Sequence, residues 1–456
     1  MATGQRHGWT PVTAPGPTGR EMLSAFDTIR TDPLAFLEWS WRKYGDVVQF
    51  PIPKPPTFLV THPDGVRRVL QANHRGYGKA TVQYSRLALV TGEGLLAADT
   101  EAWRRQRKLV QPAFHPRSVR SVVDHTGVAV ERMLARWDDL GDGAVVDVDE
   151  EMMRTALEIV GASLFGADLR GESEVLVAAT QQGLHEVVAR ARNPLAPPTW
   201  VPTPGNVRLN RAVARLDRAV AEILAARRAQ PTPAEPVDML DWLLASADLT
   251  ESDMRDQIVT FIVAGHETVA SALTWAWYLL GTDPAAADRL AAEAEARCAD
   301  GRPDFDDLPH LPWAHAVFDE ALRLYPPGWL ITRKSLVADE ILGHKLPAGS
   351  LVIISPYLVH RHDQSDPQIE SFDPGRFLSG IPSPQTGVYI PFGAGPRLCI
   401  GREMARAEGA LLLSMASRRW QLSAIDPEPA RPQPLVMLKP KGGLQMRLRR
   451  RSGARR

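Results

Sequence analysis

The chain has only two cysteines, Cys298 and Cys399, among its 456 residues. Two thiols cannot build a framework of disulfides, so the sequence predicts a protein of reducing surroundings, in the cytoplasm. An excess of charge is lacking too, because 53 Lys and Arg residues balance 53 Asp and Glu residues. This balance excludes the strongly basic character typical of nucleic-acid-binding proteins and gives no reason to expect a partner of acidic lipid.

Sequence features of membrane insertion are also scarce. The first twenty residues are polar and rich in Gly and Pro, without the apolar core of a signal peptide. One long segment, 258–280, is largely apolar, but His266, Glu267 and Thr268 lie at its middle. Ionisable groups inside a membrane are costly, so we expect a buried core helix here and no membrane contact.

The remaining composition, 44% hydrophobic and 23% charged, is that of a globular protein. Helical periodicity and start signals predict helices from Asp32-Pro33, over 101–111, 150–164 and 285–297, and from near Glu251. Strand patterns occur at 47–50, 57–61, 335–355 and 435–446. The sequence thus predicts a mainly α fold with a small β-rich lobe: a loose segment 1–20, a single domain 21–446 and a basic disordered tail 447–456.

A proline-rich stretch, 193–204, separates two helical runs and has the composition of a linker. It contains Leu195 and Trp200, and large apolar side chains favour packing over a solvated tether. We therefore expect this stretch to pack against the same domain.

Cys399 stands in a glycine-rich loop, Phe-Gly-Ala-Gly-Pro-Arg-Leu-Cys-Ile-Gly, which spans 392–401 and precedes a helical pattern. Glycines let the backbone come close to the sulfur, and loop N–H groups with a helix N-terminus would stabilise its thiolate. A thiolate held in this way suits haem iron, where it favours O–O cleavage. The alternative is a structural cysteine buried in a turn.

A second motif, Ala264-Gly265-His266-Glu267-Thr268, lies inside the long helix that starts near Glu251. Ala264 and Gly265 remove side-chain bulk and would leave room for a diatomic ligand. The Thr268 hydroxyl can bond the carbonyl of Ala264 and open the helix locally, and Glu267 offers an exchangeable proton. Alone, the motif would favour the alternative, a helix with a back-bonded threonine and a surface glutamate.

Two other metal or nucleotide signatures are incomplete. His266-Glu267 begins a zinc HExxH pattern, but position 270 is Ala, and the Gly393-x-Gly395 pair has Leu398 where a dinucleotide loop needs its third glycine. We expect no metal site besides haem, and we expect His360 and His362 to be surface or structural residues.

The loop resembles the cysteine-ligand loop of the cytochrome P450 family in its order Phe392, Gly393, Gly395, Arg397, Cys399 and Gly401. The resemblance extends over nearly the whole chain and implies the P450 fold, haem b as cofactor and Cys399 as its axial iron ligand. It further implies that Arg397 pairs with a haem propionate and that Phe392 shields the sulfur. Glu267 and Thr268 look like the acid–alcohol pair that delivers protons to bound dioxygen.

Other residues match the scaffold motifs of the same family. Glu320 and Arg323 match its ExxR motif, and Arg376 lies in a segment similar to PERF that departs from it at Gly375; these three imply a buried charge network that fixes the cysteine loop. Trp103 and Arg107, four apart on one helix face, resemble the WxxxR motif and imply propionate binding, as does Arg333, with Lys79 as a further candidate.

The resemblance implies a soluble bacterial monooxygenase that hydroxylates a largely apolar small molecule. The composition fits an actinobacterial source and secondary metabolism, and we expect a monomer. The pocket walls would be the regions 82–90, 197–201 (a mobile roof), 262–268, 329–331 and 434–437. Electrons would come from a separate ferredoxin and ferredoxin reductase, docked on a basic face of Arg104, Arg105, Lys108, Arg402 and Arg406.

Two alternatives stay open at this stage. The same haem could catalyse epoxidation, coupling or stepwise oxidation. A haem-thiolate sensor without turnover is a different class, against which the Glu267–Thr268 pair argues.

Overall fold

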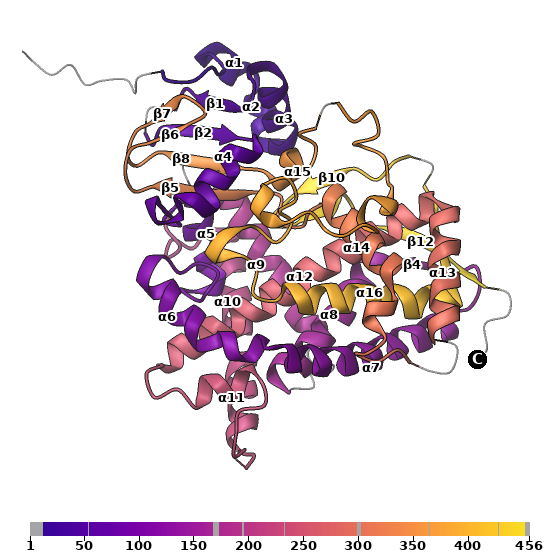
Figure 1. Cartoon of the computed structure of the whole chain (residues 1–456). Coiled ribbons are helices and arrows are strands. Elements are labelled where there is room, and N and C mark those ends of the chain that lie inside the picture. The colour runs from indigo at the N-terminus through magenta and orange to yellow at the C-terminus, as the bar shows by residue number, and fades with distance from the viewer. Residues whose placement is uncertain are drawn as a thin grey trace, which may run out of the picture. The chain divides into compact units, whose positions relative to one another are not determined.

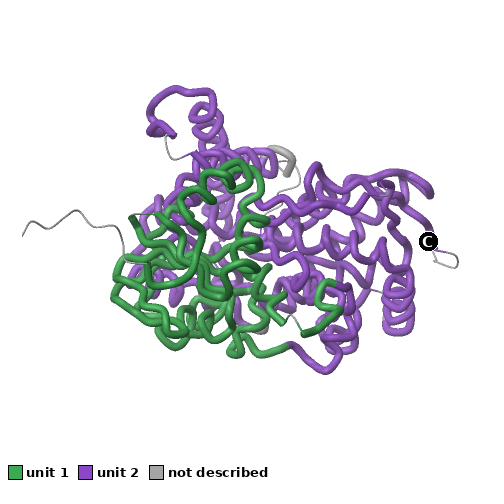
Figure 2. Tube along the Cα trace, turned by 90° about the horizontal axis from the view of Figure 1, so that it is seen from above, with its two compact units in different colours: residues 1–83, 328–370, 382–399 green, residues 84–327, 371–381, 400–456 purple. Residues whose placement is uncertain are grey.

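The computed structural model describes residues 12–52, 54–166, 173–193, 196–231, 233–298, 302–363, 365–426 and 428–451. Figure 1 traces the chain, which is mainly helical with small β-sheets, as expected. Its residues group into two compact units (Figure 2). The first comprises 1–83, 328–370 and 382–399, and the second comprises 84–327, 371–381 and 400–456.

The first unit is built on a five-stranded sheet of order β1-β2-β8-β5-β3, beside a two-stranded β6–β7 ribbon. The β1 and β2 strands are buried along their whole length, because their valine, phenylalanine and leucine side chains suit a sheet covered on both faces. The helices of this unit are α1 (Gly19–Ser24), α2 (Phe26–Thr31), α3 (Pro33–Tyr44), α4 (Pro63–Arg67) and α15 (Pro356–Val359). Its strands are β1 (Val47–Phe50), β2 (Thr57–Val60), β3 (Tyr77–Gly78), β5 (Ile331–Ser335), β6 (Asp339–Ile341), β7 (His344–Leu346) and β8 (Leu351–Ile354).

The second unit contains the longer helices and two small antiparallel sheets, β4-β12-β9 and β10-β11. Its helices are α5 (Val82–Thr91, whose first two residues belong to the first unit), α6 (Thr100–Val110), α7 (Pro116–Leu140), α8 (Val148–Phe165), α9 (Ser173–Ala191), α10 (Pro204–Arg228), α11 (Met239–Leu244), α12 (Glu251–Thr282), α13 (Pro284–Cys298), α14 (Pro312–Leu324) and α16 (Arg402–Arg419). Its strands are β4 (Val145–Asp147), β9 (Trp420–Ala424), β10 (Pro432–Pro434), β11 (Leu438–Pro440) and β12 (Gln445–Arg450).

Helix α12 forms the centre of the second unit and packs against α8, α10, α14 and α16. A capping box of Thr250 and Asp253 starts it. Ser271 Oγ and Trp275 Nε1 both donate to the Leu438 carbonyl, at 2.8 and 2.7 Å, and so fasten β11 to the helix. Among the described helices it alone is long and apolar enough to cross a membrane, but 83% of its most apolar window is buried inside the protein, as expected of a core helix.

The predicted ends of the domain need two corrections. Helix α1 begins at Gly19, inside the segment expected to be loose, because Thr18 and Glu21 form a capping box there. Strand β12 continues to Arg450, so the basic residues 447–450 are not a tail. Arg450 pairs with Trp420 of β9 and lays its guanidinium over that ring, 4.4 Å from the centroid. Residues 1–11 and 452–456 of the predicted ends lie outside the described residues.

Candidate active site

The cysteine loop, in the first unit, is a tight turn that depends on glycine. Gly393 and Gly395 have φ of +73° and +70°, in the left-handed region that side chains disfavour. A Cβ on Gly395 would lie 2.0 Å from the Leu70 carbonyl oxygen, so no other residue fits there. The Cys399 N–H donates to the Phe392 carbonyl at 2.9 Å, closing the loop, and Cys399 itself is exposed. The loop thus presents the sulfur from a fixed backbone.

A buried histidine is hydrogen-bonded to the backbone just before the same loop. His360 Nε2 accepts from the Ile390 N–H at 2.9 Å, and the Ile390 carbonyl in turn accepts from Gly393 at 2.9 Å. His360 is 3% exposed, which agrees with the structural role expected for it. Its contact with the loop could not be predicted from the sequence, because the two segments are 30 residues apart.

The residues of the motif on α12, in the second unit, differ in their exposure to solvent. Ala264, Gly265 and Thr268 are partly exposed in the middle of a helix that is otherwise mostly buried. The Thr268 hydroxyl donates to the Ala264 carbonyl at 2.7 Å, as expected. Thr274 makes the same bond to Ala270 at 2.8 Å but is fully buried. The exposure of Thr268, and not its back-bond, therefore distinguishes it.

Gly265 corrects one expectation. A Cβ at this position would lie 2.8 Å from Cγ2 of Val160 on α8. The missing side chain therefore permits close packing of α12 on α8, and the room ascribed to this glycine is used by a neighbouring helix. Space beside α12 is left to Ala264 and Thr268.

Glu267 is 3% exposed and is not the surface glutamate of the alternative interpretation. Its Oε1 lies 3.9 Å from Nζ of Lys439 on β11, but that ammonium is closer to Asp149, at 3.4 Å. Burial raises the pKa of Glu267, and the nearby Lys439 charge opposes this shift while Asp149 reinforces it. Because the lysine is shared with Asp149, its charge offsets the effect of burial only in part, and the pKa of Glu267 stays above its usual value.

His266 is completely buried and its Nδ1 bonds the Ile262 carbonyl within the same helix. Burial lowers the pKa of His266 to about 4, so it is neutral near pH 7. It is a core histidine of α12, in agreement with the rejection of a zinc motif.

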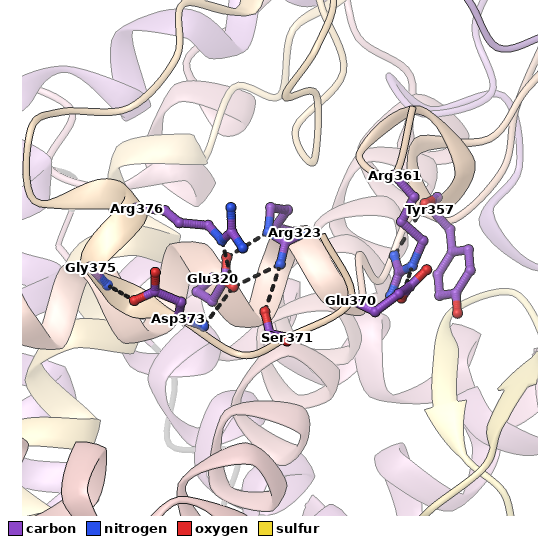
Figure 3. Close-up of polar contacts among 9 residues, drawn as sticks. All are labelled: Glu320, Arg323, Tyr357, Arg361, Glu370, Ser371, Asp373, Gly375 and Arg376. Carbon is purple, nitrogen blue, oxygen red and sulfur yellow. Dashed lines mark hydrogen bonds and ion pairs between the residues drawn. The ribbon is translucent and has the colours of Figure 1, made fainter. Parts of the chain in front are cut away.

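Glu320 and Arg323 of α14 form the buried pair predicted by the ExxR pattern (Figure 3). Arg323 Nε and Nη2 donate to the two carboxylate oxygens at 2.6 and 2.8 Å, and Glu320 is 0% exposed. Arg323 also reaches the Ser371 carbonyl at 3.1 Å. The pair therefore joins α14 to the segment that begins at Ser371.

The same segment satisfies the rest of the carboxylate. The Asp373 N–H donates to Glu320 Oε1 at 2.9 Å, and Arg376 Nε lies 3.8 Å from the same oxygen (Figure 3). Gly375, where the sequence departs from the family pattern, donates its N–H to Asp373 Oδ1 at 2.9 Å and leaves Arg376 in place. The network lies wholly within the second unit, and its action on the cysteine loop stays a prediction.

The other predicted haem contacts lie on regular elements. Trp103 and Arg107 are both partly exposed, one turn apart on α6. Arg333 of β5 and Lys79, which follows β3, come from neighbouring strands and are 7% exposed each. Arg397 forms the end of a short helical turn, 395–397, and Gly401 precedes α16.

Acidic side chains partly neutralise the predicted basic face. Arg406 Nη2 pairs with the buried Asp319 at 2.9 Å, and Arg402 Nη2 pairs with Glu403 at 2.6 Å. Arg104 also has an acidic partner, Glu101. Of the five residues, Arg406 belongs to an internal ion pair and is removed from the docking surface, because releasing it would strand a buried carboxylate.

The predicted roof, 197–201, is held by hydrogen bonds. Buried Asn206 donates to the Pro198 and Val201 carbonyls, both at 2.8 Å, and Arg190 Nη2 donates to the Pro197 carbonyl at 2.7 Å. Trp200 is 80% exposed, contrary to the packing expected of it, and Leu195 lies outside the described residues. Arg192 also donates to the Pro434 carbonyl at 2.6 Å, which links the region of the roof to the predicted pocket wall at 434–437.

Comparison with known proteins decides the identity of this fold. The family model described as Cytochrome P450 matches residues 15–446. The chain belongs to the cytochrome P450 family. It is 34% identical to cyclooctatin synthase of Streptomyces melanosporofaciens (95% of this chain, 94% of the relative) and 32% identical to cyclooctat-9-en-7-ol 5-monooxygenase of the same organism (91% and 90%). The crystal structure of CYP175A1 from Thermus thermophilus superposes with a TM-score of 0.78 at 33% identity, covering 94% and 98% of the two chains.

This chain is accordingly a cytochrome P450 monooxygenase, and the cofactor of such enzymes is a haem with a thiolate-bound iron. The residues present fit that group. The glycine loop offers one exposed sulfur donor, and α12 offers a partly exposed stretch without bulk at Ala264. Arg333 and Lys79 supply positive charge of the sign that propionates require.

Several residues around the P450 motifs carry no signal in the sequence. Lys439 and Asp149 flank Glu267, and Arg190 and Asn206 hold the roof, yet each lies in a stretch without a motif. They are recognised only in the structure, as buried charged or amide side chains with defined partners. Burial of an individual polar residue depends on the folded chain and has no local sequence signal.

Substituting Glu320→Gln should lower the free energy of unfolding by about 3 kcal/mol, because Arg323 would remain buried without its counter-charge. The matched control is Glu38→Gln, which removes a surface ion pair with Arg42 at 2.8 Å and should cost less than about 1 kcal/mol. Denaturant unfolding of both variants measures the difference, and equal losses would contradict a structural role for the buried network.

His266 should make the P450 fold sensitive to acid. Its pKa rises from about 4 in the folded chain to its ordinary value of 6.5 on unfolding, so the unfolded chain binds the proton more readily. The free energy of unfolding therefore decreases as the pH falls from 6.5 toward 4. At pH 5 it should be about 2 kcal/mol lower than at pH 7 because of this group. Denaturant unfolding at pH 7 and pH 5 measures this decrease. It should be smaller in His266→Gln than in wild type by the same amount. The same substitution at exposed His185 is the control, and parallel losses in all three proteins would refute the assignment.

Proposed function

We propose that this P450 hydroxylates a largely apolar, cyclic, terpenoid-like molecule in secondary-metabolite biosynthesis. The observation that carries the proposal is the glycine loop that presents Cys399 from a fixed backbone. Two relatives, cyclooctatin synthase and cyclooctat-9-en-7-ol 5-monooxygenase, support the substrate class by the cyclic compounds in their names. The haem, when bound, supplies the chemistry of dioxygen activation.

Residues of this chain have separate tasks in that reaction. Cys399 is the iron ligand, and Arg397, Arg333, Trp103 and Arg107 bind the propionates. Phe392, Gly393 and Gly401 shape the ligand loop, and Ala264 keeps bulk away from the dioxygen side.

Proton delivery falls to Glu267 and Thr268. Burial raises the pKa of Glu267, which favours the protonated form of its carboxyl, and the partly exposed Thr268 hydroxyl can pass a proton on. Lys439, shared between Glu267 and Asp149, positions the acid.

The remaining assignments complete the proposal. Residues 19–450 act as one P450 domain, in the cytoplasm, as a monomer. A ferredoxin and its reductase supply electrons, and docking relies on Arg104, Arg105, Lys108 and Arg402. A different oxidation of the same substrate class, such as epoxidation or coupling, is the second candidate, because the same haem and the same proton donors would serve it.

The first test is the carbon monoxide difference spectrum of the reduced protein. Wild type should show the strongly red-shifted Soret band of thiolate ligation, and Cys399→Ser should lose it, because the hydroxyl is a poor substitute for the soft sulfur. A normal haem content in both proteins is the control. Absence of the band in folded, haem-loaded wild type would overturn the ligand assignment.

The second test isolates the hydroxyl of Thr268. Thr268→Val should reduce product formed per reductant consumed by about tenfold or more, because valine keeps the shape of threonine but cannot relay a proton. Thr274→Val removes an equivalent back-bonding hydroxyl from the same helix and should leave this ratio near that of wild type. The ratio is measured with reductant, product and peroxide assays. Similar ratios in the two variants would count against the relay.

A further inference from the structure

A cluster of three potential metal ligands lies in the first unit and includes none of the residues proposed for haem. Asp46 precedes β1, His62 follows β2 as the N-cap of α4, and His362 follows α15. Ligand atoms of the three side chains all lie within 4.8 Å of one another, and each residue is partly buried. No local pattern in the sequence indicates this cluster, because its members are 16 and 300 residues apart.

The spacing is close to that of a tetrahedral metal site. Ligands at about 2.0–2.1 Å from a zinc ion stand roughly 3.3 Å from each other. His362 Nε2 lies 2.9 Å from Asp46 Oδ1, and the longest separations in the cluster are at most 4.8 Å. The tetrahedral value falls inside this interval. A common ion would replace the proton between His362 and Asp46, and His62 would give up the bond that its Nδ1 accepts from the Asp64 N–H at 3.1 Å.

The ligands are held in place by surrounding groups. Asp46 Oδ1 accepts from Trp41 Nε1 at 3.0 Å and from Thr61 Oγ1 at 3.1 Å. These two bonds and the bond from His362 all end on Oδ1 of Asp46, and none of the three involves Oδ2. The His362 ring stacks on Trp41, with centroids 6.1 Å apart. Hydrogen bonds and packing that orient ligands in this way raise metal affinity.

The hairpin fixes two ligands relative to each other. Strands β1 and β2 pair from Val47 with Val60, and the Thr61 N–H donates to the Asp46 carbonyl at 3.0 Å. Asp46 and His62 therefore stand at the same end of one rigid hairpin. A site whose backbone is fixed in the absence of metal loses little entropy when the ion binds.

We propose that Asp46, His62 and His362 bind a divalent transition-metal ion such as Zn²⁺, with water completing the coordination. Two imidazoles and one carboxylate are a ligand set typical of zinc. The ion would stabilise the fold by joining the β1–β2 hairpin to the segment after α15. It serves no step of the proposed oxidation.

The test is calorimetric titration of the haem-loaded, tag-free protein with ZnCl₂ after treatment with a chelator. Haem loading matters because Cys399 is a competing soft ligand when no iron is bound. Wild type should bind one equivalent, and His62→Asn and His362→Gln should each weaken binding by at least about tenfold. Asparagine can still cap α4, and glutamine can still donate to Asp46, so both variants keep the local hydrogen bonds.

The control is His185→Gln, which removes an exposed histidine of another region and should bind Zn²⁺ as wild type does. A thermal melt adds a second measurement: Zn²⁺ should raise the melting temperature of wild type and of the control, but not of the two ligand variants. Absence of saturable binding, or equal affinity in all four proteins, would overturn the proposal.

Discussion

The need to compensate buried carboxylates governs the second unit, and it does so differently at two glutamates. Glu320 receives two bonds from Arg323, one from the Asp373 N–H and the nearby charge of Arg376. Both carboxylate oxygens accept hydrogen bonds, so this carboxylate connects α14 to the segment after Ser371. Its surroundings make it a structural residue.

Glu267 lies in a comparably buried place but has only a share in Lys439, 3.9 Å away. Compensation is incomplete here, so burial raises the pKa of Glu267 although the lysine charge opposes the shift. Two buried glutamates in one unit thus differ in their partners, and the less compensated Glu267 is the one proposed to deliver protons. The anchoring of Leu438 by Ser271 and Trp275 fixes the backbone beside Lys439, so the balance at Glu267 depends on the packing of β11 against α12.

The sequence was informative where spacing along one element determines contact. The pairing of Glu320 with Arg323 and of Thr268 with Ala264 follows from helical periodicity, and the strands at 47–50 and 57–60 follow from their apolar runs. It failed where the partner is distant. Gly265 was interpreted without its neighbour Val160, and Arg406 without its partner Asp319. In both cases a tertiary contact that no local pattern reveals decides the role of the residue.

The hydrogen bonds of the predicted roof limit the population of molecules in which that loop is open. Opening 197–201 breaks the bonds from Arg190 to Pro197 and from Asn206 to Pro198 and Val201. At about 1 kcal/mol each, the open form would be less stable by about 3 kcal/mol and present in roughly one molecule in 150. A ligand that enters by this route would meet a receptive form only rarely, and its apparent association would be slowed by the same factor.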